Sequence, residues 1–80
     1  MTKFEEWVRC QRNLGTTVNY LEVDEDAKLV QTSSSYIAYG MVMNNPPVYH
    51  IWANDKPYKK TSNYDEAYRI WNREICCKAM

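Results

Sequence analysis

The sequence lacks the features that most directly identify a nucleic-acid-binding protein or an enzyme. Its 80 residues carry no net charge, since ten Lys and Arg balance ten Asp and Glu, and they include one histidine. Proteins that bind through phosphate contacts usually have a clear basic excess. A catalytic site brings a nucleophile, a base and an orienting group together. His50, among aromatic neighbours in a predicted strand, does not supply such a set, so we expect no enzymatic activity.

Long hydrophobic runs and paired cysteines are also missing. No apolar run approaches the ~20 residues that a membrane-spanning helix needs, and the amino terminus is charged from Lys3 onward. Three cysteines, Cys10, Cys76 and Cys77, are an odd number, which is typical of reduced thiols. We therefore expect a cytoplasmic chain without a membrane segment. Cys10 and one of the adjacent pair are expected to be small apolar fillers of the core.

A zinc site is the one metal centre that the residue types allow. The three cysteines and His50 could in principle provide four ligands. Their spacing opposes this, because structural zinc sites use paired ligands a few residues apart. Adjacent cysteines on a helix point about 100° apart, which follows from 3.6 residues per turn. We expect no metal and no cofactor.

Apolar residues make up 45% of the chain, a share typical of folded globular domains and not of disordered ones. The chain is short enough that residues 1–80 are expected to form one domain. Two helices are predicted. Thr2 followed by Glu5 is a capping box, and a helix over residues 2–13 ends before Gly15. Its apolar face is Phe4, Trp7, Val8 and Leu14. A second helix, over residues 64–77, is capped by Ser62 or Asn63.

Between the helices, β-branched and aromatic residues predict strands. Residues 16–23 form the first, closed by the acidic residues 24–26. Residues 27–35 are ambiguous between a short helical turn and a strand that pairs back on the first, and we favour the strand. Residues 36–43 predict one continuous strand, residues 44–47 break it with two prolines, and residues 48–53 form the next. A turn at 54–57 leads to a short last strand at 58–60.

This order predicts an α+β domain: a three- to four-stranded antiparallel sheet, arranged as a meander, with the N-terminal and C-terminal helices packed on one face. Two short helices cover one face only, so the other face would remain in water. Because residues 48–53 are apolar on both faces, aromatic side chains on the open face are expected to contact a partner. The expected contact residues are Tyr36, His50, Trp52 and Tyr58. Alternatively, residues 24–35 fold over this face.

Three lysines, Lys56, Lys59 and Lys60, gather near Tyr58 and Trp52. Lysine beside an aromatic ring is a combination that holds phosphate and stacks a base. The order helix, strands, helix also resembles the double-stranded RNA-binding domain. That family has a lysine-rich motif at the start of its last helix, whereas the matching residues 62–66 here are acidic. The resemblance covers topology, and RNA binding is an alternative to a plain solvated turn.

A compact, aromatic-rich domain without catalytic machinery is typical of a binding protein. In size and make-up the chain resembles the small host-takeover and anti-defence proteins of bacteriophages, anti-CRISPR proteins among them. The resemblance implies that the protein docks on a larger host protein or nucleoprotein in the host cytoplasm and covers its working surface. The lysines or the acidic residues 24–26 would steer the approach. A homodimer that buries the same surface is a further alternative.

Overall fold

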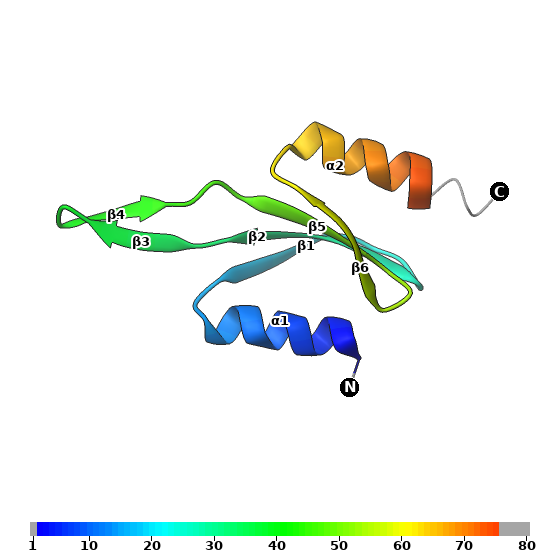
Figure 1. Ribbon diagram of the computed structural model, residues 1–80, viewed down its shortest axis with the longest axis horizontal. Coiled ribbons are helices and arrows are strands. Elements are labelled where there is room, and N and C mark those ends of the chain that lie inside the picture. The colour runs from blue at the N-terminus through cyan, green and yellow to red at the C-terminus, as the bar shows by residue number, and fades with distance from the viewer. Residues whose placement is uncertain (1, 76–80) are drawn as a thin grey trace.

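The computed structural model describes residues 2–75, which form an antiparallel sheet with one helix before it and one after it (Figure 1). The elements in chain order are α1 (Lys3–Asn13), β1 (Thr17–Val23), β2 (Ala27–Ser33), β3 (Ser35–Ala38), β4 (Met41–Asn44), β5 (Val48–Ala53), β6 (Lys56–Thr61), α2 (Tyr64–Ile70) and the π-helical turn η1 (Trp71–Ile75). The main sheet has the order β1-β2-β5-β6, and β3 pairs with β4 alone. The α+β class and a four-stranded antiparallel sheet are confirmed, while positions 76 and 77 of the predicted second helix lie outside the described residues.

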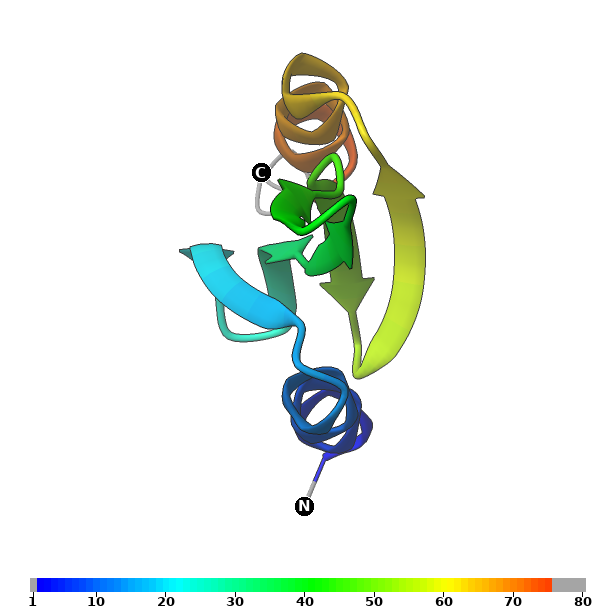
Figure 2. The same ribbon diagram turned by 90° about the vertical axis from the view of Figure 1, so that its left-hand side faces the viewer.

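The two helices lie on opposite faces of the main sheet, so the expectation that both pack on one face is wrong (Figure 1, Figure 2). Successive residues of a strand point to opposite faces. In β2, Leu29 packs in the cluster under α2, and Val30 packs in the cluster under α1. In β5, Ile51 and Trp52 divide in the same way. The central strands are therefore buried on both sides, which explains why residues 48–53 are apolar on both faces.

Each helix closes its own hydrophobic cluster. The cluster under α1 is rich in aromatic rings, and its buried members are Phe4, Val8, Val18, Val30 and Trp52, with Trp7 packed against them. The buried members of the cluster under α2 and η1 are Ala27, Leu29, Tyr49, Ile51, Ala67, Trp71 and Ile75. No face of the central strands is left open for a partner, within the part of the chain that the structure describes.

Helix α1 is also tied to the sheet by hydrogen bonds at its start. The Thr2 hydroxyl accepts a hydrogen bond from the Glu5 amide, as the capping pattern predicted. The two carboxylate oxygens of Asp55, in the β5–β6 turn, accept hydrogen bonds from the backbone amides of Phe4 and Lys3, each at 3.0 Å. These bonds lower the pKa of Asp55 because they favour its charged form. One side chain thus joins residues that are 51 and 52 positions apart.

Residues 36–43 are two strands, whereas the sequence pattern predicted one. The chain reverses at Tyr39 and Gly40, and β3 pairs antiparallel with β4. Pro46 and Pro47, expected in the turn of a hairpin, instead lie between β4 and β5, where strand pairing is interrupted. Proline has no amide to donate. Pairing begins again at Val48, and its partner there is β2. β5 therefore pairs with β2, and not with the strand immediately before it.

Two residues expected in the core are exposed. Leu14 is 79% exposed because α1 ends at Asn13 and Leu14 lies just beyond its last turn. Cys10, expected as an apolar filler, is an exposed free cysteine. It lies two positions after Val8, and residues two apart on a helix do not share a face.

Replacing Trp52 by alanine is expected to destabilise the fold by about 3–5 kcal/mol, because a buried indole is deleted and leaves a cavity. Trp52 is 6% exposed, and its ring centroid lies 5.3 Å from Phe4 and 5.4 Å from Trp7. Urea unfolding measures the change. The exposed Leu14→Ala variant is the control and should stay within about 0.5 kcal/mol of wild type. A Trp52→Ala protein as stable as that control would contradict this packing.

Candidate functional site

His50 and Trp52, two of the expected contact residues, lie beneath helix α1. Trp52 is packed against both Phe4 and Trp7 and is a core residue. His50 is half-buried, with its ring centroid 4.9 Å from that of Trp7 and its Nε2 3.0 Å from the Thr32 hydroxyl. A side chain that its own chain covers has little surface left for a partner, so neither residue forms an open contact face.

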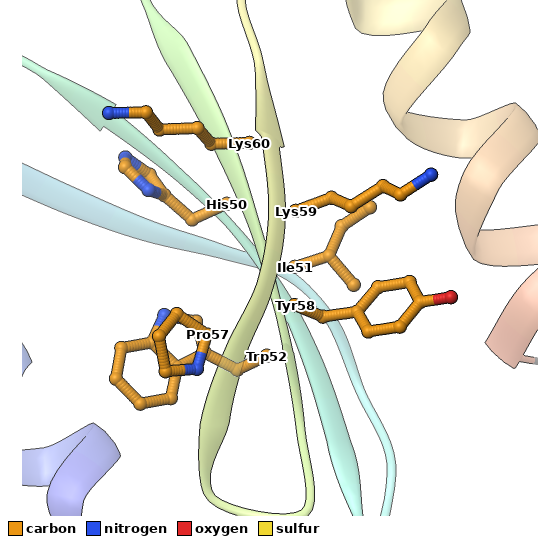
Figure 3. Close-up of a pocket in the computed structure, with 7 residues that line it drawn as sticks. All are labelled: His50, Ile51, Trp52, Pro57, Tyr58, Lys59 and Lys60. Carbon is orange, nitrogen blue, oxygen red and sulfur yellow. The ribbon is translucent and has the colours of Figure 1, made fainter.

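His50 lies beside Lys60 on the next strand, on the α1 side of β5 (Figure 3). Burial lowers the pKa of His50 below its ordinary value, and the positive charge of Lys60 lowers this pKa further. The neutral imidazole is therefore the form that fits the folded protein. This makes His50 a source of pH-dependent stability.

We expect the fold to lose stability as the pH falls below about 6.5, the ordinary pKa of His50. Because the folded-state pKa is the lower one, the native state binds fewer protons than the unfolded state between the two values. The contribution of His50 is complete above the unfolded pKa and is lost as the pH falls through the folded pKa. Urea midpoints at about pH 7.5 and about pH 5.5 test this. In the His50→Gln control the difference should be smaller, and an unchanged difference would contradict the assignment.

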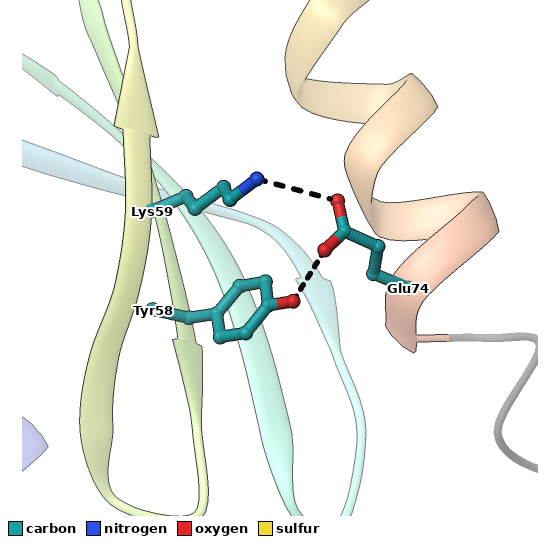
Figure 4. A network of polar contacts seen from close by, with 3 residues as sticks. All are labelled: Tyr58, Lys59 and Glu74. Atoms are coloured by element: carbon teal, nitrogen blue, oxygen red, sulfur yellow. Dashed lines mark hydrogen bonds and ion pairs between the residues drawn. The ribbon is translucent and has the colours of Figure 1, made fainter.

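The three lysines do not form one patch. Lys60 points to the α1 side of β6, while Lys59 and Tyr58 point toward α2 and η1 (Figure 3). The Lys59 ammonium lies 3.6 Å from a carboxylate oxygen of Glu74, and the Tyr58 hydroxyl donates a hydrogen bond to the other oxygen (Figure 4). Lys56 is exposed at the start of β6.

A carboxylate therefore stands among the side chains expected to hold phosphate. The hydrogen bond from Tyr58 lowers the pKa of Glu74, with Lys59 contributing further, so Glu74 is charged at neutral pH. The same bond raises the pKa of Tyr58. Negative charge at this position opposes the approach of a phosphate backbone. The geometry gives the lysine cluster less capacity for RNA than the sequence suggested.

Tyr36 lies on a separate feature, the β3–β4 hairpin with its turn, residues 35–44, which we call the arm. The arm extends beyond the main sheet, away from both helices, at the end of the long axis of the molecule (Figure 1). Pairing of β1 with β2 stops at Ser33, and pairing of β6 with β5 stops at Tyr49. Neither outer strand flanks the arm, so each of its two strands has one free edge within the described residues.

The arm exposes large apolar side chains on both faces. Cross-strand pairing places four residues on one side, the methionine face: Tyr36 opposite Met43, and Ala38 opposite Met41. The other side, the valine face, has Ile37 opposite Val42 beside the polar pair Ser35 and Asn44. The exposed large apolar residues of the arm are Tyr36, Ile37, Tyr39, Met41, Val42 and Met43. Tyr36 is the one of these six that was among the expected contact residues.

All 20 charged residues of the chain lie outside residues 29–54. For residues 29–33 of β2 and for β5 this lack of charge follows from burial on both faces, since charged groups are almost never fully buried unless they are paired. Burial does not explain it for the arm, which is in water. An exposed apolar hairpin without charge is the kind of surface that a partner usually covers.

The tip of the arm is a two-residue turn with an unusual occupant. Tyr39 has φ 55° and Gly40 has φ 74°, both left-handed, as a type I′ hairpin turn requires. Glycine and asparagine enter this region easily, whereas a tyrosine there costs on the order of 1 kcal/mol. Gly40 was the available sequence signal for the reversal. Tyr39 concealed it, because aromatic residues favour strands.

Replacing Tyr39 by asparagine is expected to stabilise the folded protein by about 0.5–1 kcal/mol, since asparagine tolerates the left-handed conformation. Thermal unfolding should show a Tm a few degrees higher. Tyr39→Ala is the matched control. It also removes the exposed ring, but alanine pays the cost of the left-handed conformation because it has a Cβ and no side-chain group that forms a local hydrogen bond. Equal Tm values for the two variants would contradict a strained turn.

Other parts of the described chain offer little chemistry. Among residues 2–75, no group of three or more His, Cys, Asp or Glu side chains could hold a metal ion. The acidic residues 24–26 are exposed at the β1–β2 turn. None of the described helices has the length and apolar character needed to cross a membrane.

Comparison with family models, with curated proteins and with solved structures finds no match for this chain.

Proposed function

We propose that this chain is a non-enzymatic binding protein that docks on a larger protein through the arm. The observation that supports it is an exposed hairpin, apolar on both faces, in a stretch without charge. Covering apolar surface gains roughly 25 cal/mol per Å². Tyrosine and methionine, which the arm carries, are enriched at protein interfaces. The contact surface thus moves from the sheet face to the arm, and Tyr36 is the originally expected residue that remains in it.

The arm is well suited to present these side chains. Its two strands continue the directions of β2 and β5, which are buried on both faces, so its base is anchored in the core. At that base the Asn45 amide donates to the Ser34 carbonyl at 2.9 Å, and the Asn45 side chain donates to the Ser34 hydroxyl at 2.8 Å. A contact element that is ordered before binding loses little conformational entropy when it binds.

The mechanism that follows is steric. The arm occupies a surface of the partner while the helices and the main sheet remain outside as bulk that blocks access. Inhibition of a host protein or nucleoprotein, in the manner of bacteriophage anti-defence proteins, is proposed on the resemblance in size and make-up. The neutral arm and the Glu74 carboxylate favour a protein partner over RNA.

Val42→Lys is expected to abolish partner binding, because it places an unpaired charge in the contact. The chain is immobilised, the protein that it captures from a lysate of candidate host cells is identified and purified, and Kd is measured by calorimetry. Val23→Lys is the matched control: Val23, 61% exposed in β1, and Val42, 69% exposed in β4, undergo the same substitution. The control should bind like wild type. Undiminished binding by both Val42→Lys and Met41→Lys, which change opposite faces of the arm, would contradict the proposal if both variants have a wild-type Tm.

The salt dependence of the same Kd separates protein from RNA as the partner. Docking through an uncharged arm should change Kd by less than about threefold between 50 mM and 200 mM salt, whereas phosphate contacts would weaken it by orders of magnitude. Lys59→Glu combined with Lys60→Glu should leave Kd unchanged. A steep salt dependence together with loss of binding in this double variant would instead support RNA.

A further inference from the structure

The two faces of the arm indicate how the partner is shaped. Resting on the proposed function, we propose that the partner is a foreign protein that receives the arm in an uncharged, apolar groove contacting both faces, with Tyr39 entering first. Tyr39 is fully exposed at the tip of the arm, and tyrosine is among the residues that most often anchor protein interfaces.

Contact with a flat surface would cover one face and leave the other in water. Docking on the methionine face leaves Val42, 69% exposed, and Ile37 uncovered. Docking on the valine face leaves Met41, 60% exposed, and Tyr36 uncovered. Both faces combine large apolar side chains with an absence of charge, so neither face has the charged residues typical of a surface that stays in water. Insertion into a groove covers both faces.

The area of the arm agrees with insertion. Covering its six large apolar side chains removes on the order of 800 Å² of surface from water, which is about the share of one partner in a standard interface. One face alone supplies about half of that, in the range of weak crystal-packing contacts. A stable complex through the arm therefore needs both faces.

Charge complementarity sets the chemistry of the groove. A charged group in the groove would be desolvated when the arm binds, and the arm has no opposite charge to pair with it. This desolvation costs free energy. At the base of the arm the surface becomes polar but stays neutral, with a shallow hollow that includes Thr17, Ser33, Ser34, Asn44 and Asn45. Neutral polar groups around an apolar centre are the usual rim of an interface. The groove is thus apolar inside, with uncharged hydrogen-bonding groups at its entrance.

Residues 2–75 of a second copy do not supply such a groove. Outside the arm, the exposed large apolar side chains of residues 2–75 come from separate places: Leu14, Tyr20, Val23, Tyr58 and Tyr64. They lie after α1, in and at the end of β1, in β6 and at the start of α2. A second copy therefore offers its own arm as the apolar surface, and stacking two arms buries one face of each, about half of the area that a stable dimer needs.

Two neighbouring substitutions test insertion, because Met41 and Val42 point to opposite faces and are similarly exposed. Kd for the purified partner is measured with wild type, Met41→Lys, Val42→Lys and the Val23→Lys control. Insertion predicts that each arm variant weakens binding by roughly 30-fold or more, while the control stays within about twofold of wild type. Thermal unfolding verifies that each variant is folded. If a lysine variant does not fold, the serine variants Met41→Ser and Val42→Ser are measured in place of the lysine variants.

Each outcome decides between distinct explanations. If one arm variant alone loses affinity, the partner is flat: insertion fails while docking through the arm stands. If both bind like wild type, the arm is not the contact and both proposals fail. Sedimentation equilibrium of wild type completes the test. If wild type forms a reversible dimer and both arm variants are monomers, the arm binds a second copy, and the proposal of a groove on a foreign protein is wrong. If wild type is a monomer and captures no protein, both proposals are wrong.

Discussion

Burial of the two central strands on both faces fixes the positions of both helices and of the arm. Leu29 and Val30 in β2, like Ile51 and Trp52 in β5, are neighbours in sequence that must be covered from opposite directions. One helix cannot satisfy both, so α1 and α2 take one face each. Once both faces are covered, the apolar residues in β2 and β5 are accounted for, and the arm remains as the uncharged surface in water. The core thus determines which apolar surface stays exposed.

Features encoded by local residue chemistry could be predicted from the sequence. The helix starts follow from the caps: Thr2 accepts from Glu5, and Asn63 accepts from Glu66. The strand regions follow from β-branched and aromatic content. Which strand pairs with which is a non-local matter, and there prediction failed. Two prolines indicated a chain reversal that occurs instead at Tyr39, and the sidedness of the helices depends on β5 reaching past the arm to β2.

The candidate site was predictable only in part, because the sequence pattern of an aromatic residue does not distinguish a buried side chain from an exposed one. Trp52 and Tyr36 were assigned the same role, yet α1 covers the first, while the second extends beyond every covering element among residues 2–75. The difference lies in tertiary packing. Continuous lack of charge through residues 29–54 was the available signal, and it becomes informative only where the chain leaves the core.

Trp52 and Asp55 hold helix α1 from about fifty positions further along the chain, although Val18 and Val30 of the same cluster lie closer to it. An isolated helix of 11 residues is marginal in water. During synthesis α1 therefore precedes the residues that fix its start, and its docking is complete only after the β5–β6 turn has been made. Until then part of its aromatic side remains within reach of chaperones.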